Sequence, residues 1–359
     1  MSKPVKLVRG SLHKRRYYNE RGLIITCVVV FTITLMTFNI LLMDEITGSS
    51  TIPANSSVAS MESPTATTTA YDQPQPLSKE SCLLLMTELL KEGRRGITMH
   101  QAVEGISMYI YKDNDIVSNS LLRTGQWATA EKNGLHQALN AFAKRKNLTE
   151  QEVIFLDIGA NVGSFSLTMA SYGFSVVAFE AFGENSDLIQ ASICKNSFEL
   201  LITLHSKALG AATSTCVVYS DVHNYGDGHT QCGEQQNIVN DTFLHEGVQY
   251  NIRARIESVR LDDVLASPKI RSKIGAVKMD VEGYETHVVQ GGQGVLLNSK
   301  IPCIFTEFSP GMIRDKGGNP ADFVNTFIDA GYTAHSSFSG PALSANETNQ
   351  HGELWFILG

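Results

Sequence analysis

The stretch VIFLDIGANVGSF, residues 153–165, decides the fold of this chain. Its first residues, Val153–Leu156, form a short apolar run typical of a buried strand, and a helix is expected from Ser164. Between them Gly159 and Gly163 lack a Cβ, so the chain can turn tightly and a ligand can approach the amides at the helix start. A simple tight turn would use the same glycines, but the order strand, turn, helix favours a nucleotide-type pocket.

The next apolar strand ends at an acidic residue, Glu180, about twenty residues after Gly159. A carboxylate in this place can accept hydrogen bonds from both hydroxyls of a ribose. The glycine spacing differs from that of a dinucleotide site, because Asn161 stands where a second glycine would let a pyrophosphate come close. These features predict an adenosine ligand that has no pyrophosphate.

Apolar runs alternate with helical segments after residue 150, which predicts an α/β fold built from parallel strand–helix–strand units. A late helix should begin at the cap Asn319, bury Phe323, Phe327 and Ile328, and end at Ala330. The expected strands are 153–158, 175–180, 201–206, 274–280 and 303–308, with a helix around 185–197 and a closing antiparallel pair at 332–335 and 355–358.

Residues 79–150 precede these units and have a different pattern. We expect a helix near 83–90, a hairpin over 107–122 and a second helix over 127–146. The two alternating runs of the hairpin meet at Asp113-Asn114-Asp115, whose polar side chains are typical of a turn.

The N-terminal part has the charge pattern of a membrane anchor. Lys and Arg crowd residues 1–21, whereas residues 22–43 contain no charge and are long enough to cross a hydrocarbon core of roughly 30 Å. A cleavable signal peptide is the alternative, but its apolar region is normally only about 7–15 residues long. Because flanking basic residues stay cytoplasmic, we expect a type II, single-pass signal anchor with everything after residue 43 in the lumen. Residues 44–78 are rich in Ser, Thr and Pro and are expected to form a stalk.

The composition excludes some partners and leaves the cysteines ambiguous. A formal net charge of −7 over 359 residues offers no basic surface for a run of phosphates, so we expect no nucleic-acid partner. Five cysteines lie outside the apolar segment, an odd number that forbids complete internal pairing. Our preferred bridge is Cys216 with Cys232, and buried free thiols are the alternative. Glycosylation sequons, which matter only in the secretory pathway, occur at Asn55, Asn147, Asn240 and Asn346.

The sequence resembles the FkbM-type methyltransferase family over about residues 109–331. The resemblance rests on Asp157-Ile-Gly-Ala-Asn-Val-Gly163, Val177-Ala-Phe-Glu180 and Val277-Lys-Met-Asp-Val-Glu-Gly-Tyr-Glu285, supported by Lys207-Ala-Leu-Gly210 and Arg260-Leu-Asp-Asp263. One departure is Ala181, where the family usually has proline. The resemblance implies a Rossmann-like class I methyltransferase fold, with a mostly parallel seven-stranded sheet and helices on both faces. It also implies S-adenosylmethionine as the small-molecule methyl donor and a hydroxyl as the usual acceptor.

The resemblance also assigns roles to residues of the methyltransferase domain, which we place at 151–359, after an extension at 79–150. Glu180 would hold the ribose of the cofactor, and Ser206 would lie near its adenine. The residues expected around the amino-acid part of the cofactor are Asp157, Gly159, Ala160, Asn161 and Gly163.

The segment 278–285 is expected to supply the catalytic residues, since ligands bind at the carboxyl ends of strands in open α/β sheets. We expect Asp280 to face the reacting centre as the base, with Glu282 or Lys278 assisting. The alternative is that Asp280 and Glu282 merely cap the following helix. No metal site is expected, because the spacing of His205, His223, His229 and His287 does not match a recognisable ligand set.

Two other functions compete with methyl transfer. Asp113 and Asp115 have the Asp-x-Asp form that holds a metal and a sugar nucleotide in glycosyltransferases, and a methyltransferase fold can also be kept by a non-catalytic binding protein. The anchor and stalk favour a glycan or glycoconjugate hydroxyl as acceptor, in the Golgi or the endoplasmic reticulum. The long polar loop 219–236 is a candidate lid for that acceptor. No motif specifies the acceptor itself or the oligomeric state.

Overall fold

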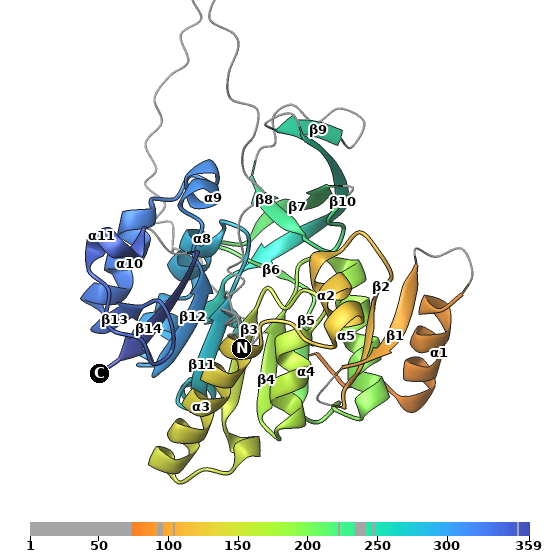
Figure 1. Ribbon diagram of the computed structural model, residues 1–359, viewed down its shortest axis with the longest axis horizontal. Helices are drawn as coiled ribbons and strands as arrows, with labels where there is room; N and C mark the ends of the chain where they lie inside the picture. Colours follow the sequence, from red (N-terminus) through yellow and green to blue (C-terminus); the bar gives the residue numbers. More distant parts are fainter. Residues whose placement is uncertain are drawn as a thin grey trace, which may run out of the picture. The chain divides into compact units, whose positions relative to one another are not determined.

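The computed structural model describes residues 74–91, 96–102, 105–221, 223–233, 242–245, 248–349 and 352–359. A seven-stranded sheet lies at its centre, in the order β13-β14-β12-β11-β3-β4-β5 (Figure 1). Only β14 runs in the direction opposite to the other six strands of this sheet, so the predicted mostly parallel sheet with a closing antiparallel pair is confirmed. The strands are β3 (Ile154–Ile158), β4 (Ser175–Phe179), β5 (Ile202–His205), β11 (Ile274–Met279), β12 (Cys303–Glu307), β13 (Tyr332–His335) and β14 (Glu353–Leu358).

Helices cover both faces of the sheet, as predicted. Alternation along β3 sends Phe155 to one apolar core and Leu156 to the other, so both sides of the strand are buried. The first core includes side chains of α3 (Thr129–Lys146), α4 (Ser164–Ser171) and α5 (Gly183–Asn196). The second includes side chains of α6 (Leu261–Val264), α8 (Glu285–Gly291), α9 (Pro310–Asp315) and α10 (Pro320–Asp329). Shorter pieces are η1 (Glu150–Glu152), α7 (Pro268–Arg271), η2 (Gly294–Asn298) and α11 (Ala345–Thr348).

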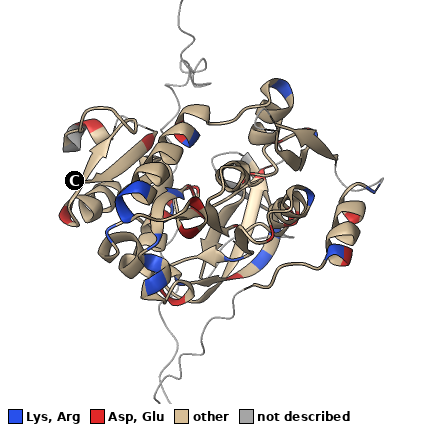
Figure 2. Cartoon of the chain, turned by 90° about the horizontal axis from the view of Figure 1, so that it is seen from below, with Lys and Arg blue, Asp and Glu red and all other residues tan. Residues whose placement is uncertain are grey.

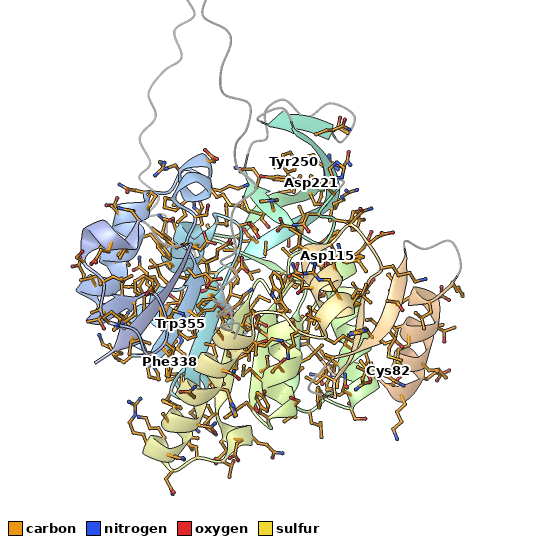
Figure 3. All side chains as sticks on the ribbon, viewed as in Figure 1. Cys82, Asp115, Asp221, Tyr250, Phe338 and Trp355 are labelled. Carbon is orange, nitrogen blue, oxygen red and sulfur yellow. A yellow bond between two sulfur atoms is a disulfide. The ribbon has the colours of Figure 1, made fainter. Side chains whose placement is uncertain are left out.

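Helix α3 approaches the sheet closely because one of its residues has no side chain. A Cβ on Gly134 would lie 2.6 Å from the Trp355 ring, closer than packing allows. Trp355 also packs against Phe305, with ring centroids 4.7 Å apart, and against Phe338 at 5.6 Å (Figure 3). The glycine thus lets a long helix lie directly on the antiparallel part of the sheet.

A second sheet is inserted between β5 and β11, and the sequence analysis anticipated only a polar loop there. Its order is β6-β10-β7-β8, with β9 paired to β10 (Figure 1). Long antiparallel pairing between β7 and β10 holds the insertion together. Its strands are β6 (Ala208–Leu209), β7 (Ser214–Asp221), β8 (His229–Cys232), β9 (Thr242–His245) and β10 (Val248–Val259).

The predicted hairpin over 107–122 is wrong in its second half. Strand β2 (Ser107–Tyr111) pairs with the preceding β1 (Ile97–Gln101), and residues after Asp115 form helix α2 (Ile116–Thr124). Asp115 is the helix cap, accepting a 2.7 Å hydrogen bond from the amide of Ser118. The polar triplet 113–115 therefore ends a strand and starts a helix, and Asp is favoured at helix caps as much as in turns.

The late helix was predicted correctly except for the burial of one side chain. Asn319 caps α10, as predicted, and Phe323 and Phe327 are buried, but Ile328 is 43% exposed, so its predicted burial is wrong. One residue turns a helix by about 100°, which points Ile328 away from the face of Phe327.

Among the described residues no helix has the length and hydropathy to span a bilayer. The expected anchor at 22–43 and most of the stalk lie outside the described residues.

Two disulfides link parts of the fold. The predicted bridge between Cys216 and Cys232 is confirmed, and these residues lie directly opposite each other on β7 and β8. An unanticipated bridge joins Cys82 of α1 (Lys79–Leu89) to Cys194 of α5, across 112 residues (Figure 3). Cys303 is the free cysteine of the described chain, and it is buried. The N-terminal extension is therefore fixed covalently to the nucleotide-type domain.

Replacing Cys82 and Cys194 by alanine should lower the free energy of unfolding by about 2–5 kcal/mol, since the bridge closes a long loop in the unfolded chain. Urea unfolding of the detergent-solubilised protein, followed by circular dichroism, measures this loss. The alanine pair at Cys216 and Cys232 should cost less, because that loop closes over only 16 residues. An unchanged midpoint for the first pair would show that the bridge does not hold the extension.

Candidate active site

The main pocket lies where the strand order of the central sheet reverses. Strand β3 has β4 on one side and β11 on the other, so the loops that follow these strands diverge and leave a crevice at their carboxyl ends. The pocket has an empty volume of about 580 Å³, open solvent at its mouth included. Its lining includes Asn161 after β3, Glu180 after β4, Asp280 and Glu282 after β11, and the turn 226–228 from the inserted sheet. The predicted lid loop thus contributes to the pocket wall.

The turn after β3 has the conformation that its glycines allow. Gly159 has a φ of +76° and Gly163 a φ of +83°, both in the left-handed region. A Cβ on Gly159 would lie 1.9 Å from the backbone oxygen of Asp280, so the two loops touch backbone to backbone. Asn161 also has a positive φ, and its Oδ1 accepts a 2.7 Å hydrogen bond from the amide of Val162. The turn is therefore locked against the loop that supplies the expected base.

Glu180 joins the first two loops of the pocket. Its carboxylate accepts hydrogen bonds from the amide of Asn161 at 2.7 Å and from the amide of Phe182 at 2.8 Å. The residue is only 6% exposed, and burial raises its pKa to about 7 even though the two amides act in the opposite direction. Each carboxylate oxygen can accept more than one hydrogen bond, so Glu180 can still accept from a ligand's hydroxyls.

Lys278 supports this arrangement from inside the sheet. Its Nζ donates to the carbonyl oxygen of Gly159 and lies 3.3 Å from Asp280 Oδ2 and 3.9 Å from Asp157 Oδ1. Burial alone would lower the pKa of Lys278, but the carboxylates of Asp280 and Asp157 outweigh burial and raise it, so the amine stays charged. Asp157 also accepts a 2.6 Å hydrogen bond from Ser166 of α4. Lys278 and Asp157 thus position the turn beneath the pocket.

The remaining predicted cofactor residues differ in their relation to the pocket. Ala160 and Gly163 shape the turn without lining the cavity. Ser206 is exposed and is absent from the lining, whereas the next residue, Lys207, is part of it. The sequence placed the end of β5 correctly, and the role expected for Ser206 near the adenine stays a prediction.

The carboxylates after β11 do not cap the following helix, so that alternative is wrong. Helix α8 receives no side-chain hydrogen bond at its cap, Tyr284. Instead, Glu285 folds back and accepts from the amides of Val281 at 3.1 Å and Gly283 at 3.3 Å. This leaves Asp280 and Glu282 in the pocket wall, with the side chain of Asp280 36% exposed.

Sequence reasoning missed two carboxylates of this site, Glu307 and Asp227, and dismissed His229. Glu307 ends β12, next to β11, and its carboxylate lies near those of Asp280 and Glu282. Asp227 and His229 come from the inserted sheet and lie near Glu282. Burial raises the pKa of Glu282 and of Glu307 well above the usual range, and neighbouring carboxylates add to the effect. The sequence marks Glu307 only as the acidic end of an apolar run, and it does not show that this strand lies beside β11.

The Asp-x-Asp pair loses its support as a sugar-nucleotide site. Asp115 is 1% exposed and caps α2, while Asp113 is exposed to solvent. Among the described residues, neither belongs to a group of side chains that could hold a metal ion. In Figure 2, acidic and basic residues both occur at many places along the ribbon.

Comparison with known proteins identifies the domain. Residues 157–334 match the profile of the methyltransferase FkbM domain. The chain contains an FkbM methyltransferase domain. The matched range starts at Asp157 and includes Glu180, Asp280 and Glu307, so the pocket described above lies within the FkbM domain. The predicted family resemblance is confirmed.

Solved structures show lower similarity. WbdD, a bifunctional kinase-methyltransferase, is 11% identical with a TM-score of 0.33, and the match covers 62% of this chain and 36% of WbdD. A TehB-like methyltransferase from Corynebacterium glutamicum is 11% identical (TM-score 0.34; 67% and 94% covered). The magnesium protoporphyrin IX methyltransferase of Synechocystis is 9% identical (TM-score 0.32; 78% and 96% covered). The chain thus spans about a third of the WbdD length, and no curated protein matches it by sequence.

Gly159→Ala should disable the pocket. The added Cβ meets the carbonyl oxygen of Asp280 and forces a non-glycine residue to a φ of +76°, so we expect a loss of at least about 2 kcal/mol in the free energy of unfolding. Gly352→Ala is the matched control, because nothing lies within 4 Å of its Cβ position, and it should change stability by less than about 0.5 kcal/mol. Chemical denaturation compares the two, and equal stabilities would contradict the backbone contact.

Proposed function

We propose that the FkbM domain transfers the methyl group of S-adenosylmethionine to a hydroxyl of a glycan or glycoconjugate. The observation that supports this most strongly is the pocket between the loops of β3, β4 and β11, walled by Glu180 and Asp280. Glu180 can accept from the ribose hydroxyls, and the anionic wall suits the positive charge of a sulfonium.

In the proposed reaction the acceptor oxygen attacks the methyl carbon. A C–O bond forms, the C–S bond breaks with its electron pair staying on sulfur, and S-adenosylhomocysteine leaves. The acceptor's proton passes to a base, for which Asp280 is our candidate, since a positioned base contributes typically 10²–10⁴-fold. Aligning oxygen, methyl carbon and sulfur accounts for a further share, about 7–11 kcal/mol when orientation is ideal.

The residues around Asp280 have distinct roles in this proposal. Glu282 lines the same wall and assists Asp280. Lys278 is a positioning residue: its buried amine contacts both the carbonyl of Gly159 and the carboxylate of Asp280. Asp157 balances its charge from the other side. Buried ionic contacts of Lys278 therefore hold this wall of the pocket in place.

We further propose that the domain lies in the lumen of the Golgi or the endoplasmic reticulum. Two disulfides within one domain are typical of oxidising compartments. Asn147, within one of the sequons, is exposed at the end of α3, where a glycan can be attached without disturbing the core. The charge pattern of residues 1–43 gives the matching type II orientation. Such a location makes glycan hydroxyls the most accessible acceptors.

Ligand titration tests the function directly. S-adenosylmethionine and sugar nucleotides are titrated separately into the full-length protein in detergent, with heat as the readout. We expect a saturable signal with S-adenosylmethionine alone, because Glu180 and Asp280 remain in the pocket wall while Asp115 is a helix cap. Heat with a sugar nucleotide alone would reverse the assignment, and heat with neither would favour a non-catalytic role.

Asp280→Asn should retain S-adenosylmethionine binding and lose methyl transfer by 10²-fold or more.

Binding of S-adenosylhomocysteine should weaken as the pH falls through 7. The pKa of Glu180 is about 7 in the free protein, and ribose hydroxyls donate to the ionised carboxylate, so affinity is full above pH 7 and is lost as the carboxylate is protonated below it. Equilibrium dialysis between pH 5.5 and 8.5 measures the profile. Glu180→Gln should bind more weakly and show a flat profile in this window. An identical slope in the variant would show that another group titrates.

Treatment of the cell-derived protein with a glycosidase tests the location. A luminal domain should lose mass on treatment, and Asn147→Gln should reduce that loss, because Asn147 is exposed. A protein whose mass is unchanged by the enzyme would contradict the luminal topology.

A further inference from the structure

Five side chains that could hold a metal ion lie at one end of the pocket. One group is Asp280, Glu282 and Glu307, whose nearest carboxylate oxygens all lie within 4.8 Å of one another. A second group, Asp227, His229 and Glu282, has the same spacing and shares Glu282. The residues come from the loop after β11, the end of β12 and the inserted sheet, so no single stretch of sequence shows the grouping.

Glu307 supplies an independent indication that something is bound between these carboxylates. Its Oε2 has less than 1 Å² of exposed surface and has no hydrogen-bond partner among the described residues. A buried carboxylate oxygen without a partner is costly, because it has lost its hydration and gained nothing in return. The oxygen belongs to a side chain that reaches into the carboxylate group, so a ligand located there would satisfy it.

The charge of the group is only partly balanced by protein cations. The buried amine of Lys316 donates to the carbonyl of Thr230 and is close enough to Glu282 for their charges to interact. Lys278 approaches Asp280 at 3.3 Å, but the same amine also balances the fully buried Asp157 and donates to Gly159. Glu282 and Glu307 are not in a salt bridge within the described part of the chain. Carboxylates this close either share protons or share a cation.

The chemistry of the donors restricts the choice of ligand. Carboxylate oxygens from three residues suit a hard divalent cation such as Mg²⁺ or Mn²⁺. His229 adds an imidazole whose Nε2 lies 3.7 Å from the carboxylate of Asp227, which orients the second group toward Glu282. The ring is held by stacking on Tyr219, with centroids 5.4 Å apart.

We propose that Asp280, Glu282 and Glu307 bind one divalent cation, with Asp227 and His229 holding Glu282 in place from the other side. This inference deepens the proposed function, and the role of the cation in methyl transfer rests on that function. A cation beside Asp280 would contact the acceptor hydroxyl and lower its pKa, so that the proton leaves more easily before the methyl group is transferred. Binding of the cation itself does not depend on methyl transfer.

Titration of MnCl₂ tests the site. The full-length protein in detergent is dialysed against EDTA and then against chelator-free buffer, and heat is recorded on addition of MnCl₂. We expect about one site per chain in the wild type. Glu307→Gln should weaken binding by tenfold or more, because it removes the charge of the oxygen that has no partner. Asp322→Asn, an exposed carboxylate in the first turn of α10, is the matched control and should leave the affinity unchanged.

Thermal unfolding separates loss of the site from loss of the fold. Without metal, Glu307→Gln should unfold at the same or a higher temperature than the wild type, since it relieves repulsion. MnCl₂ should raise the midpoint of the wild type and leave that of Glu307→Gln unchanged. Absence of saturable Mn²⁺ binding in the wild type, or equal affinity in Glu307→Gln, would overturn the proposed site.

A titration of S-adenosylmethionine in EDTA keeps the two proposals apart. If S-adenosylmethionine binds and Mn²⁺ does not, the cation site is refuted while the methyltransferase function stands. If Mn²⁺ binds and S-adenosylmethionine does not, the cation site stands and the donor assignment fails. With both ligands bound, added Mn²⁺ should increase methyl transfer in the wild type and have no effect in Glu307→Gln.

Discussion

The contact between Gly159 and the backbone of Asp280 is the constraint on which the pocket depends. Only a residue without a Cβ lets the turn after β3 approach the loop after β11 this closely. Lys278 reinforces the approach by bonding the carbonyl of Gly159 and the carboxylate of Asp280 at once. The same contact brings Glu180, through its hydrogen bond to Asn161, to the opposite wall. The groups that we propose to bind the donor and to activate the acceptor are thus held by one small interface between two loops.

The central sheet could be predicted from sequence because its signals are local. Each parallel strand is an apolar run buried on both faces, and the glycine turn and the acidic end of β4 follow directly in the chain. Helix α10 was predicted for the same reason, because its cap Asn319 stands directly before a proline in the sequence. The bridge between Cys216 and Cys232 was within reach because only 16 residues separate the two.

The rest of the site depends on long-range contacts that no local pattern contains. Glu307 joins Asp280 only because β12 is the neighbour of β11, and Asp227 and His229 join only because the inserted sheet folds over the strand ends. The bridge from Cys82 to Cys194 likewise requires α1 to pack beside α5. Asp115 was assigned to a hairpin turn because Asp is common both in turns and at helix caps. The residues after it form helix α2, so Asp115 is a helix cap.

A crystal structure with S-adenosylhomocysteine tests the central claim most directly. The account predicts the ribose hydroxyls at the carboxylate of Glu180 and the thioether sulfur on the side of the pocket formed by Asp280, with the Gly159 turn unchanged. Density for the ligand elsewhere on the domain, with the space between Glu180 and Asp280 filled only by water, would contradict it.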